Sequence, residues 1–348
     1  MSRKSITIRG VQVGGGAPIA VQSMTTTRTE NVADTVAQIK RLEAAGCEII
    51  RLAVPDLPAA NAFGKIRELV HIPMVADIHF DYKLALAAID AGADKIRINP
   101  GNIGGDANVR EVVKACQSRN LPIRIGVNGG SLARDILEEF GHTPEAMVQS
   151  ALRHIALLNR FDFDNICLSV KSSGVADTVS AYRLLHARTG YPLHLGVTEA
   201  GTAYVGTIKS AIGIGSLLLD GIGDTIRVSL THDPVEEVRA ARAILQSVGL
   251  RTFGPEVISC PTCGRCQIDL IPLAQEVEAA LEAETRAITV AVMGCAVNGP
   301  GEAAAADFGI AGGAEEGLLF RRGEPVAKVP MNGLVAALMH LIREDCTQ

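Results

Sequence analysis

Four of the eight cysteines lie between residues 260 and 295, in a pattern that suits metal chemistry. Cys260, Cys263 and Cys266 form a C-x-x-C-x-x-C run in the stretch CPTCGRC, and Cys295 follows alone in GCAVNGPGE. Clustered thiols of this kind indicate a metal site and not a disulfide framework. The other four cysteines are scattered and are expected to behave as small buried hydrophobic residues; they are Cys47, Cys116, Cys167 and Cys346.

Two kinds of metal site are compatible with this cysteine spacing, a structural zinc site and an iron–sulfur cluster. A zinc ribbon needs a second C-x-x-C or an equivalent pair, whereas Cys295 has no cysteine or histidine within four residues. Three cysteines and one position without a thiolate suit an iron–sulfur cluster better, because the iron without a thiolate can accept a substrate oxygen. The run also differs from the C-x-x-x-C-x-x-C of radical S-adenosylmethionine enzymes. Spacing therefore favours iron–sulfur, with zinc as the alternative.

A second set of polar residues lies at the ends of short apolar runs in the first 250 residues. These runs alternate with longer segments of helical periodicity, and they read PIAVQSM, CEIIRLAV, IPMVADIHF, DKIRINPG, LPIRIGVN, NICLSVKSS, LHLGVTEAG and TIRVSLT. Strand and helix alternating eight times is the signature of a closed (β/α)8, or TIM, barrel. A doubly wound open sheet is the alternative, but no Gly-x-Gly-x-x-Gly turn follows the first run. We expect a TIM barrel over residues 1–250.

In such barrels the active site is built at the carboxyl ends of the strands. The late positions of the runs carry Arg51, Asp77, His79, Arg97, Asn99, Arg124, Asn128, Lys171, Glu199, Arg227 and Ser229. Any one of these residues can be explained by a structural ion pair, but their recurrence at one end of the strands favours a site. Several cations around one mouth predict a small, highly charged anion such as a diphosphate. Asp77 and Glu199 are candidates for proton transfer or for orienting the arginines.

Beyond residue 250 the alternation stops, and a smaller α+β domain is expected over residues 251–348. The linker TFGPEVIS leads to the cysteine loop, a helix from about Pro272 to Thr285 and the strand AITVAVMGC. A hairpin, GLLFRRGEPVAKV, and a terminal amphipathic helix, GLVAALMHLIRED, complete the domain.

Composition limits where the protein works and what it binds. Hydrophobic residues make up 47% of the chain, aromatic residues only 3%, and the formal net charge is −5. An aliphatic chain of this kind is typical of α/β proteins with buried parallel strands. Its negative charge argues against a broad nucleic-acid-binding surface. No signal-peptide pattern opens the chain and no long apolar stretch predicts a membrane span. We expect a soluble, cytoplasmic protein.

Motifs from both domains resemble those of one family. The runs SCPTCGR, MGCAVNGPGEA and DFGIAGG, with QSMTTT, VADIHF, IRINPGNIG, IRIGVNGGSL and GVTEAG, are similar to the bacterial 4-hydroxy-3-methylbut-2-enyl diphosphate synthases. The resemblance covers nearly the whole chain. It implies a two-electron reductive ring opening and dehydroxylation of 2-C-methyl-D-erythritol 2,4-cyclodiphosphate, in the methylerythritol phosphate route to isoprenoids.

The resemblance also implies roles for individual residues. A four-iron, four-sulfur cluster is expected on Cys260, Cys263, Cys295 and Glu302. Glu302 would leave its iron more readily than a thiolate would, so that a substrate oxygen can bind. Cys266 departs from the family pattern and offers a thiolate in place of Glu302, but a fourth thiolate would close the site. Substrate contacts are expected from Arg51, Arg97, Asn99, Arg124, Asn128, Lys171 and Ser229. Glu199 is the first choice for proton donor, and Asp77 the second.

Partners follow from what the sequence lacks and from chain geometry. No flavin or nicotinamide fingerprint is present, so the electrons are expected from flavodoxin or ferredoxin. In a TIM barrel the last helix ends opposite the mouth, so a short linker favours a head-to-tail homodimer in which one chain's cluster domain caps the partner's barrel. Two rival hypotheses are a redox-silent barrel resembling the pterin-binding synthases with a structural zinc module, and a non-catalytic iron–sulfur carrier.

Overall fold

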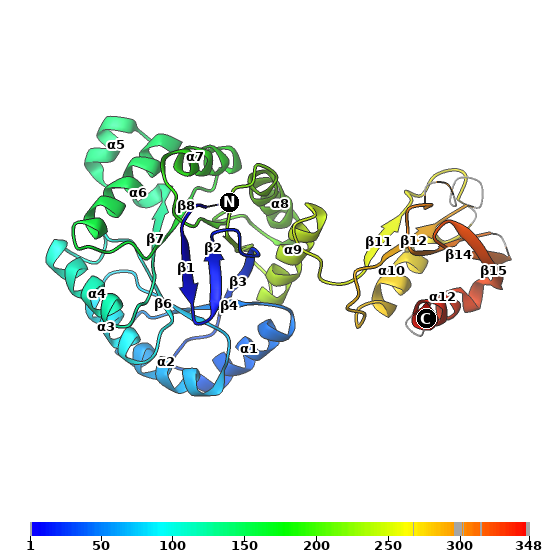
Figure 1. The fold of residues 1–348 in the computed structure, drawn as a ribbon, viewed down its shortest axis with the longest axis horizontal. Helices are drawn as coiled ribbons and strands as arrows, with labels where there is room; N and C mark the ends of the chain where they lie inside the picture. The colour runs from blue at the N-terminus through cyan, green and yellow to red at the C-terminus, as the bar shows by residue number, and fades with distance from the viewer. Residues whose placement is uncertain (1, 267, 296–300, 302, 314, 346–348) are drawn as a thin grey trace. The chain divides into compact units, whose positions relative to one another are not determined.

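The computed structural model describes residues 2–266, 268–295, 301, 303–313 and 315–345. The chain divides into two compact units, Met1–Arg251 and Thr252–Gln348 (Figure 1). The larger unit holds the strand-end cations, and the smaller unit holds the clustered cysteines.

Eight parallel strands form the central sheet of the larger unit. Their order in the sheet is β8-β7-β6-β5-β4-β3-β10-β9. The bounds are β3 Ala20–Met24, β4 Ile49–Ala53, β5 Met74–Asp77, β6 Lys95–Ile98, β7 Ile123–Asn128, β8 Ile166–Lys171, β9 His194–Leu195 and β10 Thr225–Ile226. The two ends of this order, β8 and β9, meet through a parallel bridge between Leu168 and Leu193. The predicted closed barrel is confirmed.

Helices surround these strands (Figure 1). They are α1 Val32–Ala44, α2 Leu57–Leu69, α3 Tyr82–Asp90, α4 Asp106–Ser118, α6 Pro144–Asn159, α7 Val175–Arg188, α8 Ala203–Leu219 and α9 Pro234–Ser247. Between β7 and α6 the chain adds a short 3-10 turn, η1 (Gly129–Ser131), and a seven-residue helix, α5 (Arg134–Phe140). Among the described helices, none is long and apolar enough to cross a lipid bilayer.

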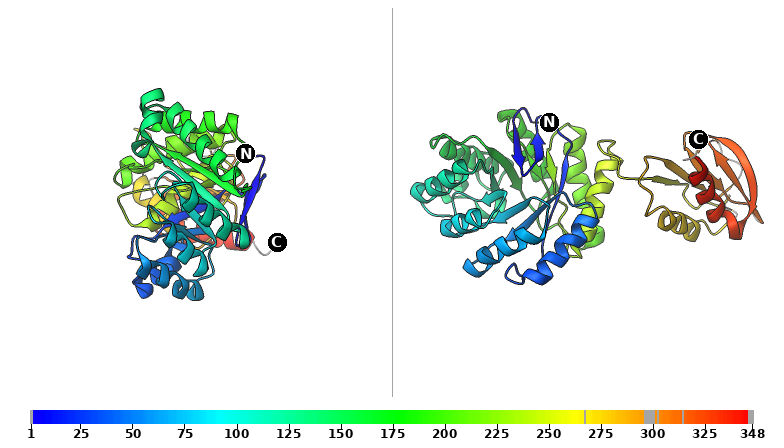
Figure 2. Two further views of the ribbon diagram at one scale, coloured as in Figure 1. Left: turned by 90° about the vertical axis from the view of Figure 1, so that its left-hand side faces the viewer. Right: turned by 60° about the horizontal axis from the view of Figure 1, so that its bottom comes forward.

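The N-terminal hairpin closes one end of the barrel. Its strands, β1 (Ser5–Ile8) and β2 (Val11–Gly14), pair antiparallel. Ile6, Ile8 and Val13 are buried against residues near the starts of the barrel strands, namely Ala20, Ile49, Val75 and Cys167. Figure 2 shows the hairpin, in blue, at one end of the barrel. Because the amino-terminal end is covered, the carboxyl ends are left to form a site.

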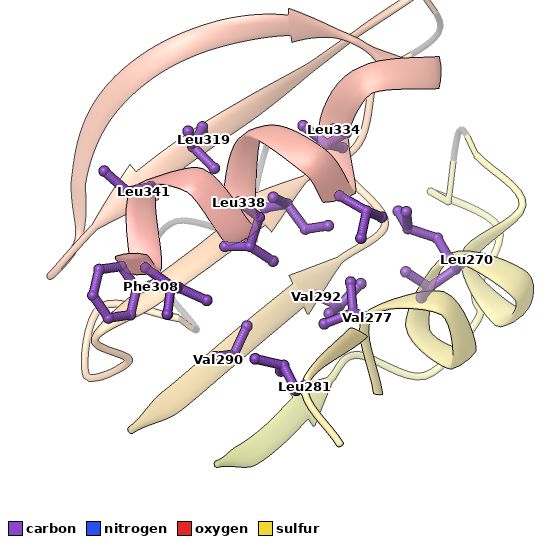
Figure 3. Packing of buried hydrophobic residues seen from close by; sticks show 14 residues of the cluster. Leu270, Val277, Leu281, Val290, Val292, Phe308, Leu319, Leu334, Leu338 and Leu341 are labelled. Atoms are coloured by element: carbon purple, nitrogen blue, oxygen red, sulfur yellow. The ribbon is translucent and has the colours of Figure 1, made fainter. Parts of the chain in front are cut away.

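The smaller unit is a five-stranded sheet in the order β11-β12-β13-β14-β15. The bounds are β11 Glu256–Ser259, β12 Thr289–Met293, β13 Phe308–Ala311, β14 Glu316–Arg321 and β15 Glu324–Pro330. The first three strands are parallel and the last three antiparallel. Helices α10 (Leu270–Ala280) and α12 (Leu334–Glu344) contribute Val277 and Leu338 to a core with Val292 and Phe308 (Figure 3).

The helix expected to reach Thr285 ends earlier, at Ala280. The chain leaves the helical path because the Glu284 carboxylate accepts hydrogen bonds from the backbone N–H groups of Thr285 and Arg286, at 2.9 and 3.0 Å. A side chain that binds its neighbours' backbone in this way offers the chain an alternative to helix.

Candidate active site

A cationic pocket of about 270 Å³ lies at the carboxyl ends of the barrel strands. It brings together eight of the strand-end residues that the sequence indicated, namely Arg51, Asp77, His79, Arg97, Asn128, Lys171, Arg227 and Ser229. Met24, Ser169 and Thr198 complete the lining. The strand register explains the grouping, because Asp77 pairs with Arg97 and Arg97 with Arg124 on neighbouring strands.

Asp77 is the centre of the charge arrangement. Its carboxylate lies 3.0 Å from Arg97 Nη1, 3.6 Å from Arg51 Nε and 3.5 Å from His79 Nε2. Burial on its own raises the pKa of Asp77, but the charge of Arg51, the His79 contact and the charge of Arg97 hold it far below the usual range. Asp77 is therefore a permanent anion that fixes the two guanidinium groups in place.

The cations outnumber their carboxylate partners. Arg227 has the Glu237 carboxylate at 3.5 Å, whereas no carboxylate in the described part of the chain forms an ion pair with Lys171. Burial lowers the pKa of Lys171 well below 10.5, and neighbouring arginines lower it further. A polyanionic ligand would relieve this repulsion, which is the condition that a diphosphate-binding pocket requires.

Two inward-facing glycines make room for these cations. A Cβ atom at Gly126 would lie 2.5 Å from Arg97 Nε, and one at Gly196 would lie 2.8 Å from Lys171 Nζ. Only glycine at these positions lets the long side chains lie across the barrel interior.

The sequence did not predict the part that two residues, Arg227 and Glu237, play in this charge arrangement. Arg227 lies at a strand end but is not among the predicted substrate residues. Glu237, from α9, accepts a hydrogen bond from the Leu230 N–H at 2.9 Å as well as facing Arg227. An acidic residue in the first turn of a helix is usually solvent-exposed and stabilises the helix dipole. No pattern in the sequence therefore distinguished Glu237.

Beneath the pocket lies a second, fully buried layer. Arg124 is 1% exposed and donates to Gln22 Oε1 at 3.4 Å. It does not line the pocket itself, and burial together with Arg97 lowers its pKa to about 10. Lys95 is completely buried, and its Nζ has no hydrogen-bond partner among the described residues. Burial and the charges of Arg124 and Arg51 lower the pKa of Lys95 to about 7.

Replacing Lys95 by methionine is expected to stabilise the barrel in a pH-dependent way. The pKa of Lys95 falls from 10.5 to about 7, so keeping the amine inside costs on the order of 4 kcal/mol at and below pH 7. Between pH 7 and 10.5 the unfolded chain binds a proton that the folded chain does not, so the stability of the unmodified protein rises with pH. The advantage of Lys95→Met should therefore be largest at or below pH 7 and vanish near pH 10.5. Thermal unfolding across this range tests it, and equal pH slopes for both proteins would contradict it.

Glu199 and Asn99 lie away from the cationic pocket. Glu199 follows β9 with a positive φ of 52° and lines an adjoining cavity of about 490 Å³. Asn128, Lys171 and Thr198 line both spaces and so connect them. Asn99 accepts a hydrogen bond from the Gly101 N–H at 3.2 Å and lines a third cavity, behind the loop that follows β6.

In the smaller unit, the cysteines follow the ends of adjacent parallel strands. β11 leads into Cys260, and β12 leads into Gly294 and Cys295. The Gly294 N–H donates to Cys260 Sγ at 3.2 Å, so the two loops are in contact. The thiol of Cys266 donates to the Ile268 carbonyl at 3.2 Å, and it lies so close to Gly294 that a Cβ there would be 2.5 Å from its sulfur.

The chemistry of these thiols fits a thiolate-bound group. Cys263 is exposed, and hydrogen bonds from the backbone and side chain of Arg265 lower its pKa. Burial instead raises the pKa of Cys47 and of Cys116 to about 12. Over the described ranges, no three Cys, His, Asp or Glu side chains are already grouped as metal ligands. Glu302 and Cys346 lie outside the described residues. The cysteine loops therefore supply thiol donors of the expected type, one of which, Cys263, favours the thiolate.

Comparison with known proteins places both units in one family. Residues 3–242 match the GcpE TIM-barrel domain, and residues 256–344 match the GcpE protein C-terminal domain. A 4-hydroxy-3-methylbut-2-en-1-yl diphosphate synthase (flavodoxin) from Ruminiclostridium cellulolyticum is 55% identical over 98% of this chain and 97% of its own. The protein of the same name from Geobacter sulfurreducens is 57% identical over 97% of this chain and 96% of its own.

Solved structures share the fold at much lower identity. Dihydropteroate synthase from Yersinia pestis matches 71% of this chain over 100% of its own length, with a TM-score of 0.51 and 16% identity. N-acetylneuraminic acid synthetase from Leptospira borgpetersenii covers 81% of this chain, with 98% of its own length matched, a TM-score of 0.51 and 12% identity. These likenesses support the barrel fold alone. The two domain matches and the relatives above half identity over almost the full length show that the chain belongs to the GcpE family of 4-hydroxy-3-methylbut-2-en-1-yl diphosphate synthases.

Proposed function

We propose that this chain catalyses the reductive ring opening and dehydroxylation of 2-C-methyl-D-erythritol 2,4-cyclodiphosphate to 4-hydroxy-3-methylbut-2-enyl diphosphate. The observation that carries the proposal is the excess of buried positive charge in the barrel pocket, in a chain that also carries a cysteine site. The reaction takes up two electrons and two protons and releases one water. Flavodoxin, which the relatives' name includes, is the proposed electron donor, with ferredoxin as the alternative.

In this proposal the barrel binds the cyclodiphosphate through its cations. Arg51, Arg97 and Lys171 contact the phosphate oxygens, and Asp77 keeps the two arginines oriented. Arg124 contributes positive charge from the layer below. As the ring C–O bond to phosphate breaks, negative charge grows on the diphosphate. Preorganised cations stabilise that charge most strongly in the transition state. Asn128 and Ser229 provide hydrogen bonds from the pocket wall, and Asn99 joins them if its loop turns toward the substrate.

Glu199 is the proposed proton donor for the hydroxyl that leaves as water. It stands in a cavity continuous with the pocket, beside Asn128 and Lys171. Asp77 is a poor donor because its neighbouring cations keep it ionised. Its proposed role is to orient the arginines.

Replacing Glu199 by glutamine is expected to lower kcat about a hundredfold or more, because a positioned general acid contributes roughly 10²- to 10⁴-fold. Binding of the cyclodiphosphate should stay within a few-fold of normal, since the pocket cations are untouched. Asp177→Asn is the matched control, because Asp177 lines the same cavity. Full turnover of Glu199→Gln with a chemical reductant would refute the assignment.

Cys260, Cys263 and Cys295 are the proposed thiolate ligands of a four-iron, four-sulfur cluster, with Glu302 as the fourth ligand. Such a cluster, when bound, supplies the two electrons one at a time. The chain's own contribution is to place Cys260 and Cys295 at the ends of adjacent strands and to favour the thiolate of Cys263.

Metal content separates this proposal from the zinc alternative. Protein purified without oxygen should be brown and contain about four irons per chain. A colourless protein with one zinc per chain would refute the redox function. A coloured protein that fails to bind the cyclodiphosphate in calorimetry would instead indicate a carrier.

We also propose that the working unit is a head-to-tail homodimer. The linker leaves the barrel opposite the pocket, because Arg251 donates to the Ile19 carbonyl at 2.8 Å and pairs with Glu48 at 2.6 Å, both just before barrel strands. The nine residues from Thr252 to Cys260 span about 30 Å when extended. That length leaves little chain to bring the thiols round to the pocket of the same barrel.

An apolar stripe on α8 supports a second copy as the partner. Tyr204, Val205, Ile208, Ile212 and Leu219 are each at least 43% exposed. Lys209 is the one charged residue of this helix. Exposed apolar patches mark interaction surfaces. An uncharged stripe can also pack against its own copy across a two-fold axis.

A further inference from the structure

The third cavity, about 540 Å³ in volume, lies between the loop after β6 and helices α5 and α6. None of the described residues that line the cationic pocket also lines this cavity. Its volume lies within the range of small-molecule sites, which are typically about 300–1,000 Å³. We call it the side cavity.

The lining of the side cavity combines apolar side chains with polar and charged ones. Leu132, Ile136 and Leu157 contribute the apolar walls. Among the polar residues of the lining, Asn99, Ser150 and His154 are buried, and each is at most 8% exposed. No residue that the structure describes forms a hydrogen bond with the His154 ring. Burial, together with Arg153, lowers the pKa of His154 to about 4, so the ring is neutral and offers one donor and one acceptor.

Two arginines from one face of α6 also line the side cavity. Arg153 and Arg160 are seven residues apart, which places them two helical turns apart on the same side. Each is ion-paired at the surface, Arg153 with Asp135 at 2.7 Å and Arg160 with Asp106 at 2.6 Å. The arginine side chains are 50% and 62% exposed. Exposed ion pairs contribute little to stability, so a ligand with two phosphates can replace the carboxylates at little cost.

We propose that the side cavity is a second ligand site that takes a hydroxylated short-chain alkenyl diphosphate, the class of the reaction's own product. This inference rests on the proposed function. The branched alkenyl body packs against Leu132, Ile136 and Leu157. The terminal hydroxyl meets His154 and Ser150, and the diphosphate binds Arg153 and Arg160. A bare anion would leave the apolar walls unused, and a neutral hydrocarbon would leave the arginines unused.

Occupancy of the side cavity acts on the catalytic loops. Asn99 belongs to the lining, and Ser131 and Leu132 line both the side cavity and the cavity that contains Glu199. A ligand here therefore holds the loop after β6 and the turn that follows Asn128. We expect product bound in the side cavity to inhibit turnover noncompetitively, so that excess cyclodiphosphate does not abolish the inhibition.

Calorimetry with the anaerobically purified, unreduced holoprotein tests the site. Arg160→Ser should weaken binding of 4-hydroxy-3-methylbut-2-enyl diphosphate at the side cavity tenfold or more, and Leu157→Trp, which fills the cavity, should do the same. Arg97→Ala removes a pocket cation and should leave this binding within about threefold. Arg183→Ser is the matched control, because Arg183 is 53% exposed and pairs with Asp220 at the carboxyl end of α8. Binding that is lost in Arg97→Ala and retained in both Arg160→Ser and Leu157→Trp would overturn the proposal.

Two related probes test the chemical class. Dimethylallyl diphosphate lacks the terminal hydroxyl and should bind about tenfold more weakly, since it leaves the buried polar groups unpaired. Inorganic diphosphate should bind more weakly still. Equal binding of all three would overturn the assignment. Turnover of the cyclodiphosphate without added product is measured in parallel. Absence of turnover in the unmodified protein would refute the proposed function. Normal turnover with purely competitive product inhibition would refute the side-cavity proposal alone.

Discussion

Replacing Cys263 by serine is expected to abolish conversion of the cyclodiphosphate and to remove the brown colour and most of the iron. Changes to residues that only support a metal ligand already cost about 10- to 100-fold in metal affinity or activity. Loss of a direct ligand should exceed that. Barrel stability should not change, because Cys263 is an exposed residue of the smaller unit. Iron content, visible absorption and turnover are the three measurements.

Cys266→Ser is the matched control for this experiment. The Cys266 thiol donates to the Ile268 carbonyl, a contact that a serine hydroxyl can keep. If Glu302 is the fourth ligand, Cys266→Ser should keep its iron and most of its activity. Loss of iron from Cys266→Ser together with retention in Cys263→Ser would show that the ligand set is wrong.

Mixing two inactive variants is expected to restore activity. Lys171→Met removes a pocket cation, and Cys263→Ser removes a cluster ligand. In a head-to-tail dimer, one of the two sites in each mixed dimer is intact in both parts. Random reassortment makes half of the dimers mixed, so activity should return to about a quarter of that of the unmodified protein. Lys171→Met is preferable to a substitution of Arg124, because Arg124 is fully buried and its loss threatens folding.

Subunit exchange must be demonstrated for this result to be decisive. Differently tagged chains, purified in sequence, isolate the mixed dimers, which should have about half the activity of the unmodified protein. If mixed dimers form and remain inactive, each chain closes on its own barrel, and the head-to-tail arrangement is wrong.

The barrel was predictable because its signal is periodic and local. Eight apolar runs, each followed by a helical segment, leave few alternatives, and a parallel barrel places every strand's carboxyl end at one mouth. The grouping of Arg51, Asp77 and Arg97 follows from that topology alone.

Features that depend on side-chain direction were not predictable. Strand position assigned Asn99 to the mouth, but its amide binds the Gly101 N–H and lines the side cavity. Arg124 was also expected at the mouth, yet it is the second residue of β7 and lies beneath the pocket, where Gln22 accepts its hydrogen bond. Glu237 reaches Arg227 from a helix whose sequence resembles any solvent-exposed helix start. These outcomes depend on packing between distant segments, which periodicity does not encode.

The most direct test of the account is anaerobic turnover of 2-C-methyl-D-erythritol 2,4-cyclodiphosphate by the holoprotein with reduced flavodoxin. The account predicts one 4-hydroxy-3-methylbut-2-enyl diphosphate for every two electrons taken from the carrier, and no product when Cys263→Ser replaces the unmodified protein. An iron-loaded protein that binds the cyclodiphosphate and oxidises the carrier, yet leaves the ring closed, would contradict it.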